Sequence, residues 1–449
     1  MTALQSSSVS GLKGTAKVPG DKSISHRALM LGAMAHGETV ISGLLEGEDV
    51  LRTARALISM GVGITPPDRA GGIWRVTGMG RKALRQPRST LYLGNSGTSA
   101  RLLMGLVAGY PVAATFTGDD SLSKRPMGRV IKPLAQMGAR FEATSGDRLP
   151  VRVTGMAHLR AIHYALPVAS AQVKSAILLA ALHAEGITSV TEPEPTRDHT
   201  ERMLRHMNIE LLIEETSSGN VISLQGGQDL MARNITVPAD PSSAAFLAVA
   251  ALITPESDIT IPHVLMSKTR DGLYETLVEM GANISFTNAR HSSGEDVADI
   301  RVKSSMLKGI TVPPDRVARM IDEFPVLSMA AACATGQTRF SNLAELRVKE
   351  SDRLSAIATG LAACGVKVDE GQETLNIEGA GGMMPGGGHI ATHMDHRIAM
   401  SFLVLGMAAK KTVTVDDSSS IATSFPNFAA LLNSLGARIA PADKTVRAA

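Results

Sequence analysis

The chain has 449 residues, of which 44% are apolar and 19% are charged, so it can bury a sizeable core. The formal net charge is only +3 and aromatic residues make up 3% of the chain, which excludes a nucleic-acid binder that relies on a basic face or on base stacking. The apolar runs are too short to cross a bilayer, and the Ser-rich first residues lack the apolar core of a signal peptide. We therefore expect a cytoplasmic protein that acts away from membranes.

The first distinctive stretch, residues 20–27, reads Gly-Asp-Lys-Ser-Ile-Ser-His-Arg between a strand-like segment and an apolar run. This pattern predicts a strand, a tight turn and the start of a helix. Lys22, Ser23 and Arg27 then lie where a helix exposes unpaired N–H groups and the positive end of its dipole. Such a site suits an anion, although an ordinary helix cap with solvated cations is the alternative.

Similar openings recur along the chain, roughly 75 residues apart, and each is followed by an apolar helical run and then a β-like segment. They begin at Val18, Leu93, Leu166, Val237, Val312 and Ile390. A period this long exceeds that of a solenoid, so each copy must contain several strands and helices. Six copies suggest two domains of three units. Because the polar openings differ while the apolar runs look alike, we expect function at the helix N-termini, converging on one cleft.

The second unit offers two anion-binding candidates. Asn95 and Gly97 lie in a Gly-containing turn that lets backbone N–H groups approach an oxyanion closely. Arg125 precedes Pro126, which is predicted to begin a helix, so its guanidinium could grip a phosphate or carboxylate with two hydrogen bonds. The alternative is a solvated cation on a loop.

The third unit begins a helix with Ser170, Ala171 and Gln172, and a second helix follows Arg197. His199 has no second ligand at metal-binding spacing, so we expect it to pair with a carboxylate or to cap the helix. The fourth opening, residues 239–243, contains no cation and is interpreted as structural.

The fifth unit is acidic at its opening, and Asp322, expected at the edge of an apolar helix, is a candidate base. Lys349 and Arg353 are predicted to share one helix face, with Glu350 beside them. Like charges four residues apart repel, and a bound anion would relieve that repulsion. A solvated helix face is the alternative.

The sixth unit contains two histidines, His393 and His396, followed by Arg397. The neighbouring arginine favours anion binding over a metal site. Cys333 and Cys364 lie within apolar helical runs, so we expect buried free thiols and no disulfide.

Taken together, five motifs in chain order resemble the 5-enolpyruvylshikimate-3-phosphate synthase family. The motifs are residues 20–27, 95–98, 124–128, 347–353 and 395–397. The resemblance implies an α/β fold, a two-domain inside-out α/β barrel known as the enolpyruvyl transferase fold, in which each domain has three βαβαββ pseudo-repeats. It places residues 21–238 in the first domain, residues 1–20 and 239–449 in the second, and the active site in the cleft between them.

The family belongs to the shikimate pathway and transfers the enolpyruvyl group of phosphoenolpyruvate to the 5-hydroxyl of shikimate 3-phosphate, with release of phosphate. The resemblance implies that shikimate 3-phosphate is bound by Lys22, Ser23, Arg27, Ser170, Ala171, Gln172, Arg197, Asp322 and Lys349. Phosphoenolpyruvate is expected beside Lys22, Asn95, Gly97, Arg125, Gln172, Arg353 and Arg397. We expect a monomer that needs no metal and no organic cofactor, because cationic side chains can neutralise the charge that Mg²⁺ handles elsewhere.

An addition–elimination reaction through a tetrahedral intermediate needs a base for the hydroxyl and an acid for the methylene carbon, and then the reverse. The resemblance gives these proton transfers to Asp322 and Glu350, with Lys22 as a donor toward the departing phosphate. We favour Asp322 for the hydroxyl, although the sequence leaves the division between the two acids open.

Two departures from the wider family resemble its class II bacterial branch. Residues 422–426 read Ala-Thr-Ser-Phe-Pro in place of a Lys-containing motif, and residues 196–200 read Thr-Arg-Asp-His-Thr. Glyphosate is expected to inhibit, since Gly97 lacks the methyl group that crowds this inhibitor in one resistant pattern.

Three alternatives remain. The enolpyruvyl transferase that acts on UDP-N-acetylglucosamine carries a cysteine in the loop before its Arg-Pro, whereas residues 119–124 contain none. An RNA 3′-phosphate cyclase is disfavoured by the charge and the low aromatic content. A non-catalytic anion-binding protein would gain nothing from two carboxylates among its cations.

Overall fold

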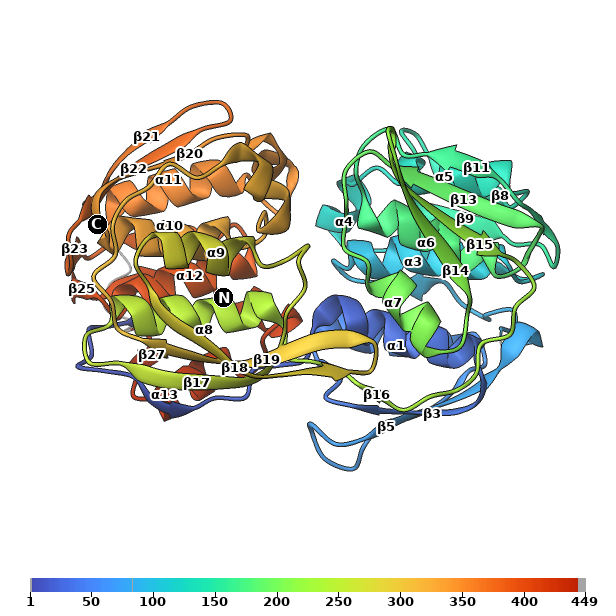
Figure 1. The fold of residues 1–449 in the computed structure, drawn as a ribbon, viewed down its shortest axis with the longest axis horizontal. Helices are drawn as coiled ribbons and strands as arrows, with labels where there is room; N and C mark the ends of the chain where they lie inside the picture. The colour runs from blue at the N-terminus through green and yellow to red at the C-terminus, as the bar shows by residue number, and fades with distance from the viewer. Residues whose placement is uncertain (1, 83, 443–449) are drawn as a thin grey trace. The chain divides into compact units, whose positions relative to one another are not determined.

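The computed structural model describes residues 2–82 and 84–442, which form two compact units (Figure 1). The first unit comprises Gly20–Val237 and His291–Glu295, and the second comprises Met1–Pro19, Pro238–Arg290 and Asp296–Ala449. The domain limits proposed from the sequence lie within a residue or two of these at residues 20 and 238. They do not include the segment His291–Glu295, the tip of a long hairpin, which belongs to the first unit.

Each unit is built around three buried helices, and each of these helices follows one of the six openings identified in the sequence. In the first unit they are α1 (Lys22–Met34), α3 (Gly97–Ala108) and α6 (Ala171–Ala181). In the second unit they are α8 (Pro241–Ile253), α10 (Phe324–Cys333) and α12 (His396–Gly406). They are apolar around most of their circumference, as expected for helices enclosed by other elements.

Small sheets cover these helices, and the three sheets of the first unit share one strand order. They are β16 (Ile235–Thr236), β3 (His36–Ser42), β5 (Trp74–Met79) and β4 (Gly63–Thr65); β6 (Leu91–Tyr92), β7 (Ala113–Thr117), β9 (Arg148–Thr154) and β8 (Arg140–Thr144); and β11 (His163–Ala165), β13 (Ile187–Glu192), β15 (Gly219–Gln225) and β14 (Leu211–Thr216). In each sheet the first pair is parallel and the other two pairs are antiparallel. Buried and exposed residues alternate along β5 and β9, so one face of each strand packs on the helices.

The second unit repeats this order. Its sheets are β2 (Lys13–Thr15), β17 (Asp258–Leu265), β19 (Glu295–Lys303) and β18 (Asn283–Ser292); β20 (Thr335–Phe340), β22 (Leu375–Ala380) and β21 (Lys367–Glu370); and β24 (His389–Ile390), β26 (Val413–Val415), β1 (Leu4–Ser6) and β27 (Ile439–Pro441). Isolated bridges at Lys308 and Thr311 occupy the position of the parallel edge strand beside β20.

Three sheets are completed by strands from distant parts of the chain, and in one of them β2 pairs with β17. The strand β16, at the end of the first unit, pairs with β3 at its beginning. The strand β1 lies between β26 and β27, so Leu4 is paired with both Val415 and Pro441. Consequently, the first residues of the chain are part of the second unit.

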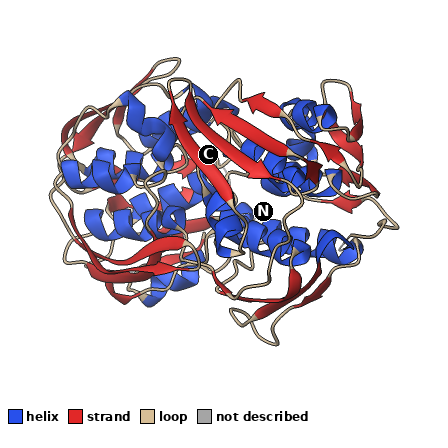
Figure 2. Ribbon diagram, turned by 45° about the vertical axis from the view of Figure 1, so that its right-hand side comes forward, coloured by secondary structure: helices blue, strands red, loops and turns tan. Residues whose placement is uncertain are grey.

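The remaining elements connect these parts. The helices are α2 (Glu48–Ser59), α4 (Asp120–Lys124), α5 (Gly128–Gln136), α7 (His199–His206), α9 (Gly272–Glu279), α11 (Arg353–Ala363) and α13 (Phe428–Ser434). Short 3-10 turns are η1 (Gly80–Lys82), η2 (Pro314–Arg319), η3 (Ala344–Val348) and η4 (Ser419–Thr423), and two-stranded pairs are formed by β10 (Leu159–Arg160) with β12 (Ala184–Glu185) and by β23 (Met384–Gly386) with β25 (Ala409–Lys411). Figure 2 shows helices flanked by strands throughout the structure.

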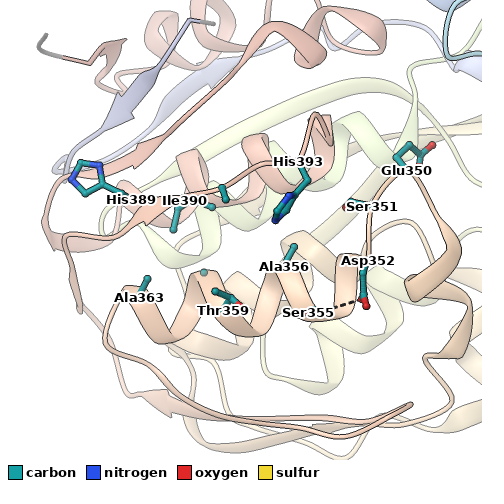
Figure 3. A pocket seen from close by; sticks show the side chains of 12 residues that line it. Glu350, Ser351, Asp352, Ser355, Ala356, Thr359, Ala363, His389, Ile390 and His393 are labelled. Atoms are coloured by element: carbon teal, nitrogen blue, oxygen red, sulfur yellow. Dashed lines mark hydrogen bonds between the residues drawn. The ribbon is translucent and has the colours of Figure 1, made fainter. Parts of the chain in front are cut away.

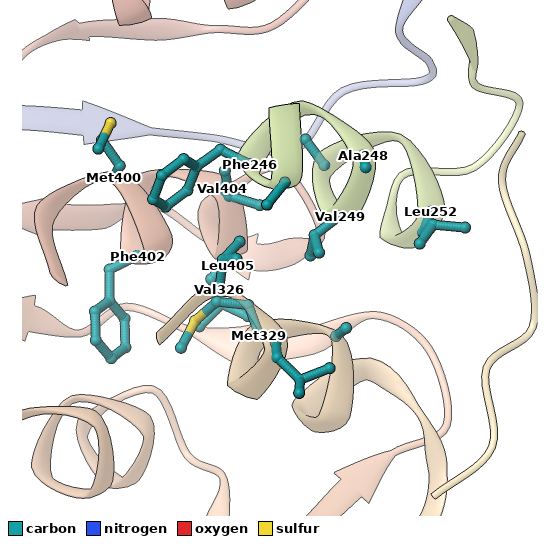
Figure 4. Close-up of a cluster of buried hydrophobic side chains, with 14 of the residues drawn as sticks. Phe246, Ala248, Val249, Leu252, Val326, Met329, Met400, Phe402, Val404 and Leu405 are labelled. Carbon is teal, nitrogen blue, oxygen red and sulfur yellow. The ribbon is translucent and has the colours of Figure 1, made fainter. Parts of the chain in front are cut away.

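The core of the second unit lies where α8, α10 and α12 meet. Phe246 and Val249 of α8, Val326 of α10 and Leu405 of α12 gather in one buried cluster (Figure 4). Cys333 and Cys364 are buried free thiols, as predicted, and burial raises the pKa of Cys333 to about 12. Within residues 2–82 and 84–442, no helix combines the length and the apolar character needed to span a membrane.

Candidate active site

The candidate residues fall into two groups, one in each unit, and most of them lie at or near the N-terminus of a helix. In the first unit they are Lys22, Ser23, Arg27, Asn95, Gly97, Arg125, Ser170, Ala171, Gln172 and Arg197. In the second unit they are Asp322, Lys349, Glu350, Arg353 and Arg397.

Lys22 occupies the first turn of α1, as predicted. The side chain of Asp21 caps this helix by accepting from the backbone N–H of Ile24 at 2.8 Å. The Lys22 Nζ lies 2.9 Å from Oδ2 of Asp49, which is on the first turn of α2, and about a quarter of the Lys22 side chain is exposed. The ammonium group is therefore oriented by a carboxylate and still reachable by a ligand.

Arg27 is almost completely buried one turn further along α1. Its guanidinium donates to Oγ1 of Thr200 and to Oγ of Ser175, each at 2.7 Å, and to the carbonyl of Ser23 at 2.9 Å. Burial lowers the pKa of Arg27 to about 10, the carboxylate of Glu201 opposes this shift, and the positive charge of Arg197 adds to it. Arg27 and Arg197 are thus close enough for their charges to repel, which a bound anion would relieve.

Arg125 and Asn95 are joined directly, since Nη2 of Arg125 donates to Oδ1 of Asn95 at 2.5 Å. The predicted helix start at Pro126 is wrong. The helix α4 ends at Lys124 and α5 begins at Gly128, so Arg125 lies in the extended link between two helices. This position still brings its guanidinium to the start of α3.

Gly97 is the first residue of α3, at a position where an added side chain would meet cations. A Cβ built on Gly97 would lie 2.9 Å from Nη1 of Arg101 and 3.3 Å from Nη1 of Arg125. The missing side chain therefore leaves space between the helix N-terminus and two guanidinium groups.

Gln172 connects the openings of the second and third units. Its Nε2 donates to Oγ1 of Thr98 at 3.0 Å, and its Oε1 accepts from Nη1 of Arg101 at 2.7 Å. Ser170 caps α6 by accepting from the N–H of Val173. Arg101 was missed in the sequence, although its position four residues after Gly97 on a helix was a usable signal.

In the second unit, three candidate cations surround Asp322. Its Oδ1 lies 3.7 Å from Nζ of Lys349 and 3.5 Å from Nη1 of Arg353, and its backbone carbonyl accepts from Arg397 at 2.9 Å. Asp322 lies in the turn before α10 rather than on the edge of a helix as expected, because α10 begins only at Phe324, with Pro325 in its first turn.

Arg353 is the most deeply buried of these cations. It donates to Oε2 of Glu350 at 2.6 Å and to Oδ2 of Asp395 at 2.7 Å. Burial alone would lower the pKa of Arg353, but the carboxylates of Glu350 and Asp395 hold it above its ordinary value. The side chain therefore stays charged within the protein.

The predicted helix that would carry both Lys349 and Arg353 is wrong. The turn η3 ends at Val348 and α11 begins at Arg353, so the two cations are on separate elements. They are close together because both approach the carboxylate of Asp322, which compensates the charge repulsion inferred from a shared helix face.

Arg397 is supported by residues that the sequence did not single out for the site. Asp395 caps α12 by accepting from the N–H of Arg397 at 2.9 Å. Glu323 lies 3.8 Å from the Arg397 guanidinium and accepts from the hydroxyl of Ser242, in the fourth opening. That opening was interpreted as purely structural, yet Ser242 is linked through Glu323 to a candidate ligand.

A cavity of about 420 Å³ lies between α11 and the segment from β24 to α12. Figure 3 shows Glu350 at one end of it and His389 at the other. Glu350 is the only candidate residue in its lining, so this cavity is a neighbour of the site rather than the site itself. No cluster of three or more His, Cys, Asp or Glu residues suited to a metal ion occurs in the part of the chain that the structure describes.

His199 is paired with a carboxylate, as predicted. Its Nδ1 lies 2.8 Å from Oε1 of Glu295, at the tip of the hairpin formed by β18 and β19, and both side chains are buried.

The comparisons with known proteins agree with the motifs. The family model described as EPSP synthase (3-phosphoshikimate 1-carboxyvinyltransferase) matches residues 7–432. A protein of that name from Parvibaculum lavamentivorans is 58% identical over 95% of this chain and 94% of its own length. Another from Chelativorans is 56% identical over 96% of each chain.

A solved structure of EPSP synthase from Acinetobacter baumannii covers 99% of this chain and 100% of its own, with a TM-score of 0.89 and 47% sequence identity. This similarity confirms the predicted fold class. The relatives' names do not favour the alternative that acts on a UDP-sugar. The chain therefore belongs to the EPSP synthase (3-phosphoshikimate 1-carboxyvinyltransferase) family.

Proposed function

We propose that the chain transfers the enolpyruvyl group of phosphoenolpyruvate to the 5-hydroxyl of shikimate 3-phosphate, giving 5-enolpyruvylshikimate 3-phosphate and phosphate. The observation that carries the proposal, besides family membership, is the environment of Asp322. One carboxylate lies within 4 Å of the cationic groups of Lys349 and Arg353, and Arg397 donates to its backbone. A base among cations suits the deprotonation of an alcohol beside two anionic substrates.

Each substrate is proposed to be bound by residues of both groups. Shikimate 3-phosphate takes Lys22, Ser23, Arg27, Ser170, Ala171, Gln172 and Arg197 of the first unit with Asp322 and Lys349 of the second. Phosphoenolpyruvate takes Lys22, Asn95, Gly97, Arg125 and Gln172 of the first unit with Arg353 and Arg397 of the second. Each substrate is therefore proposed to contact residues of both units.

Proton transfer is assigned to two carboxylates and one ammonium group. Asp322 takes the proton of the 5-hydroxyl, and Glu350 handles the proton of the methylene carbon. Lys22, whose Nζ lies 2.9 Å from Oδ2 of Asp49, donates toward the departing phosphate. We further propose that the protein acts in the cytoplasm as a monomer without a cofactor, and that glyphosate inhibits it.

The deciding experiment measures phosphate release from phosphoenolpyruvate with two acceptors in parallel. We expect release with shikimate 3-phosphate and none above background with UDP-N-acetylglucosamine. The reverse preference would assign the chain to the sugar-nucleotide reaction, and activity with neither acceptor would reject the proposed enzyme.

A further inference from the structure

Lys174, Glu192 and Glu201 form a buried cluster of charges next to candidate residues of the first unit. Nζ of Lys174, on α6, is 2.8 Å from Oε2 of Glu192 and 2.7 Å from Oε1 of Glu201. The three side chains are at most 4% exposed. Burying three charges incurs a large desolvation cost, and packed apolar residues would stabilise a fold at least as well. The cluster therefore calls for a reason other than stability.

Glu192 fixes the segment that carries Arg197. Its Oε2 accepts from the backbone N–H of Thr196 at 3.2 Å and from the Thr196 hydroxyl at 2.7 Å, in addition to Lys174. The residue immediately before Arg197 is thus tied to α6 through a single carboxylate oxygen.

Glu201 fixes the residues that hold Arg27. It lies on the first turn of α7 next to Thr200, whose hydroxyl accepts from Nε of Arg27. Ser175, which follows Lys174 on α6, accepts from Nη2 of Arg27 and from the hydroxyl of Thr200. Both hydroxyl groups that orient Arg27 therefore belong to residues next to members of the charged cluster.

The charges of the cluster also balance those of the site. Burial lowers the pKa of Lys174, but Glu201 and Glu192 raise it by more, so the ammonium group stays charged. The carboxylate of Glu201 also opposes the effect of burial on Arg27. The carboxylates of the cluster therefore act both on its own ammonium group and on Arg27.

We propose that Lys174, Glu192 and Glu201 form a positioning cluster for shikimate 3-phosphate. The cluster sets the relative placement of Arg27 and of Arg197. None of the three side chains needs to touch the substrate. The inference rests on the proposed function, because it names the groups that orient the ligands of one of the two substrates.

The test compares Glu192→Gln and Lys174→Met with the unchanged protein in steady-state assays and in calorimetric titration with shikimate 3-phosphate alone. We expect KM and Kd for shikimate 3-phosphate to rise about tenfold or more, while KM for phosphoenolpyruvate and kcat change less than about threefold. Loss of stability alone would lower the amount of active enzyme and leave both KM values unchanged.

Arg316→Met is the matched control. Arg316 is also a buried cation held by two carboxylates, those of Glu275 and Glu279, but its partners are all on α9. We expect this variant to lose stability without any change in KM for shikimate 3-phosphate.

Three outcomes are distinguishable. If Glu192→Gln has the same KM for shikimate 3-phosphate as the active wild-type protein, the positioning role of the cluster is rejected. The proposed function is then unaffected. Inactivity of the unchanged protein with both acceptors rejects the proposed function and with it this inference. Should Lys174→Met fail to fold, Glu192→Gln decides alone, because glutamine keeps the size of the side chain and removes the negative charge that holds Lys174 and Thr196 to one oxygen.

Discussion

Most candidate cations of this protein already have a carboxylate partner, which changes how substrate binding must be understood. Lys22 is paired with Asp49, Lys349 and Arg353 both approach Asp322, and Arg353 also contacts Glu350. An anionic substrate therefore enters a site of balanced charges rather than an uncompensated positive patch. Its binding depends on geometry, since it must share each cation with a fixed carboxylate.

The two acids at the centre of the second unit's group should matter for turnover more than for binding. We expect Asp322→Asn and Glu350→Gln to lower kcat by about a hundredfold or more and to keep affinity for shikimate 3-phosphate within a few-fold, because an amide keeps the shape but cannot accept the proton. Steady-state kinetics with calorimetric titration checks this. The control is Asp315→Asn, which changes an exposed acid nearby in the sequence. If affinity for shikimate 3-phosphate fell as much as kcat, the assignment of Asp322 and Glu350 to proton transfer would be contradicted.

Arg125 should act on phosphoenolpyruvate. Its guanidinium is oriented by Asn95 at the start of α3, so we expect Arg125→Ala to raise KM for phosphoenolpyruvate about tenfold or more while KM for shikimate 3-phosphate changes little. Arg129→Ala, an exposed arginine four residues later, serves as the control. An unchanged KM for phosphoenolpyruvate would remove Arg125 from the site.

Gly97 should control the balance between phosphoenolpyruvate and glyphosate. A methyl group there would come within 3.3 Å of Arg125 and closer to Arg101, reducing the space between these guanidinium groups and α3. We expect Gly97→Ala to raise the inhibition constant of glyphosate far more than KM for phosphoenolpyruvate. Inhibition assays at several phosphoenolpyruvate concentrations measure both, and equal losses would reject the prediction.

The helix α1 shows how one element holds several others in register. Nδ1 of His26 hydrogen-bonds with the hydroxyl of Thr53 on α2, and that hydroxyl in turn contacts the hydroxyl of Ser99 on α3. Burial lowers the pKa of His26 to about 3, and its Nε2 is buried with no hydrogen-bond partner among the described residues. Protonation would therefore place a charge in this helix junction with nothing to accept its proton.

A pH dependence of stability follows from this histidine. In the unfolded chain the pKa returns to about 6.5, so the unfolded state binds the proton first, and stability falls as pH decreases below 6.5 toward 3. Between pH 6.5 and about 5 we expect the free energy of unfolding to fall by up to ~1.4 kcal/mol per pH unit for this group. Urea denaturation at the two pH values measures it. His26→Gln should make the slope shallower, whereas exposed His158→Gln should not.

At the scale of the whole molecule, each substrate is proposed to need residues from both compact units. If residues of both units hold shikimate 3-phosphate, its binding should favour a more compact arrangement. We expect small-angle scattering to give a smaller radius of gyration on saturation with shikimate 3-phosphate. Shikimate without its phosphate is the control, and an unchanged radius with saturating ligand would argue against closure.

Much of the architecture was predictable from the sequence because the six openings and their apolar runs repeat. The wrong predictions concern where individual helices begin, and they arise from contacts between elements that are distant in the sequence. A helix through Lys349 and Arg353 was expected from their spacing, but Arg353 is instead buried at the start of α11 by contacts with Glu350 and Asp395. Spacing along the chain could not reveal a carboxylate supplied by another element.

The candidate ligands themselves came from motifs, whereas their supports did not. Asp49, Arg101 and Glu323 lie far in sequence from residues that they contact, namely Lys22, Gln172 and Arg397. Their roles follow only from distances in space. The buried triad around Lys174 was overlooked for the same reason, since its carboxylates are 18 and 27 residues away on other elements.

The position of β1 between β26 and β27 has a consequence for how the protein is made on the ribosome. Residues 4–6 are synthesised long before their pairing partners, the strands around Val415 and Pro441. The first unit, in contrast, has all its segments once Glu295 has been added. The second unit is therefore completed after the first, and β1 stays unpaired until both of its neighbouring strands have been synthesised.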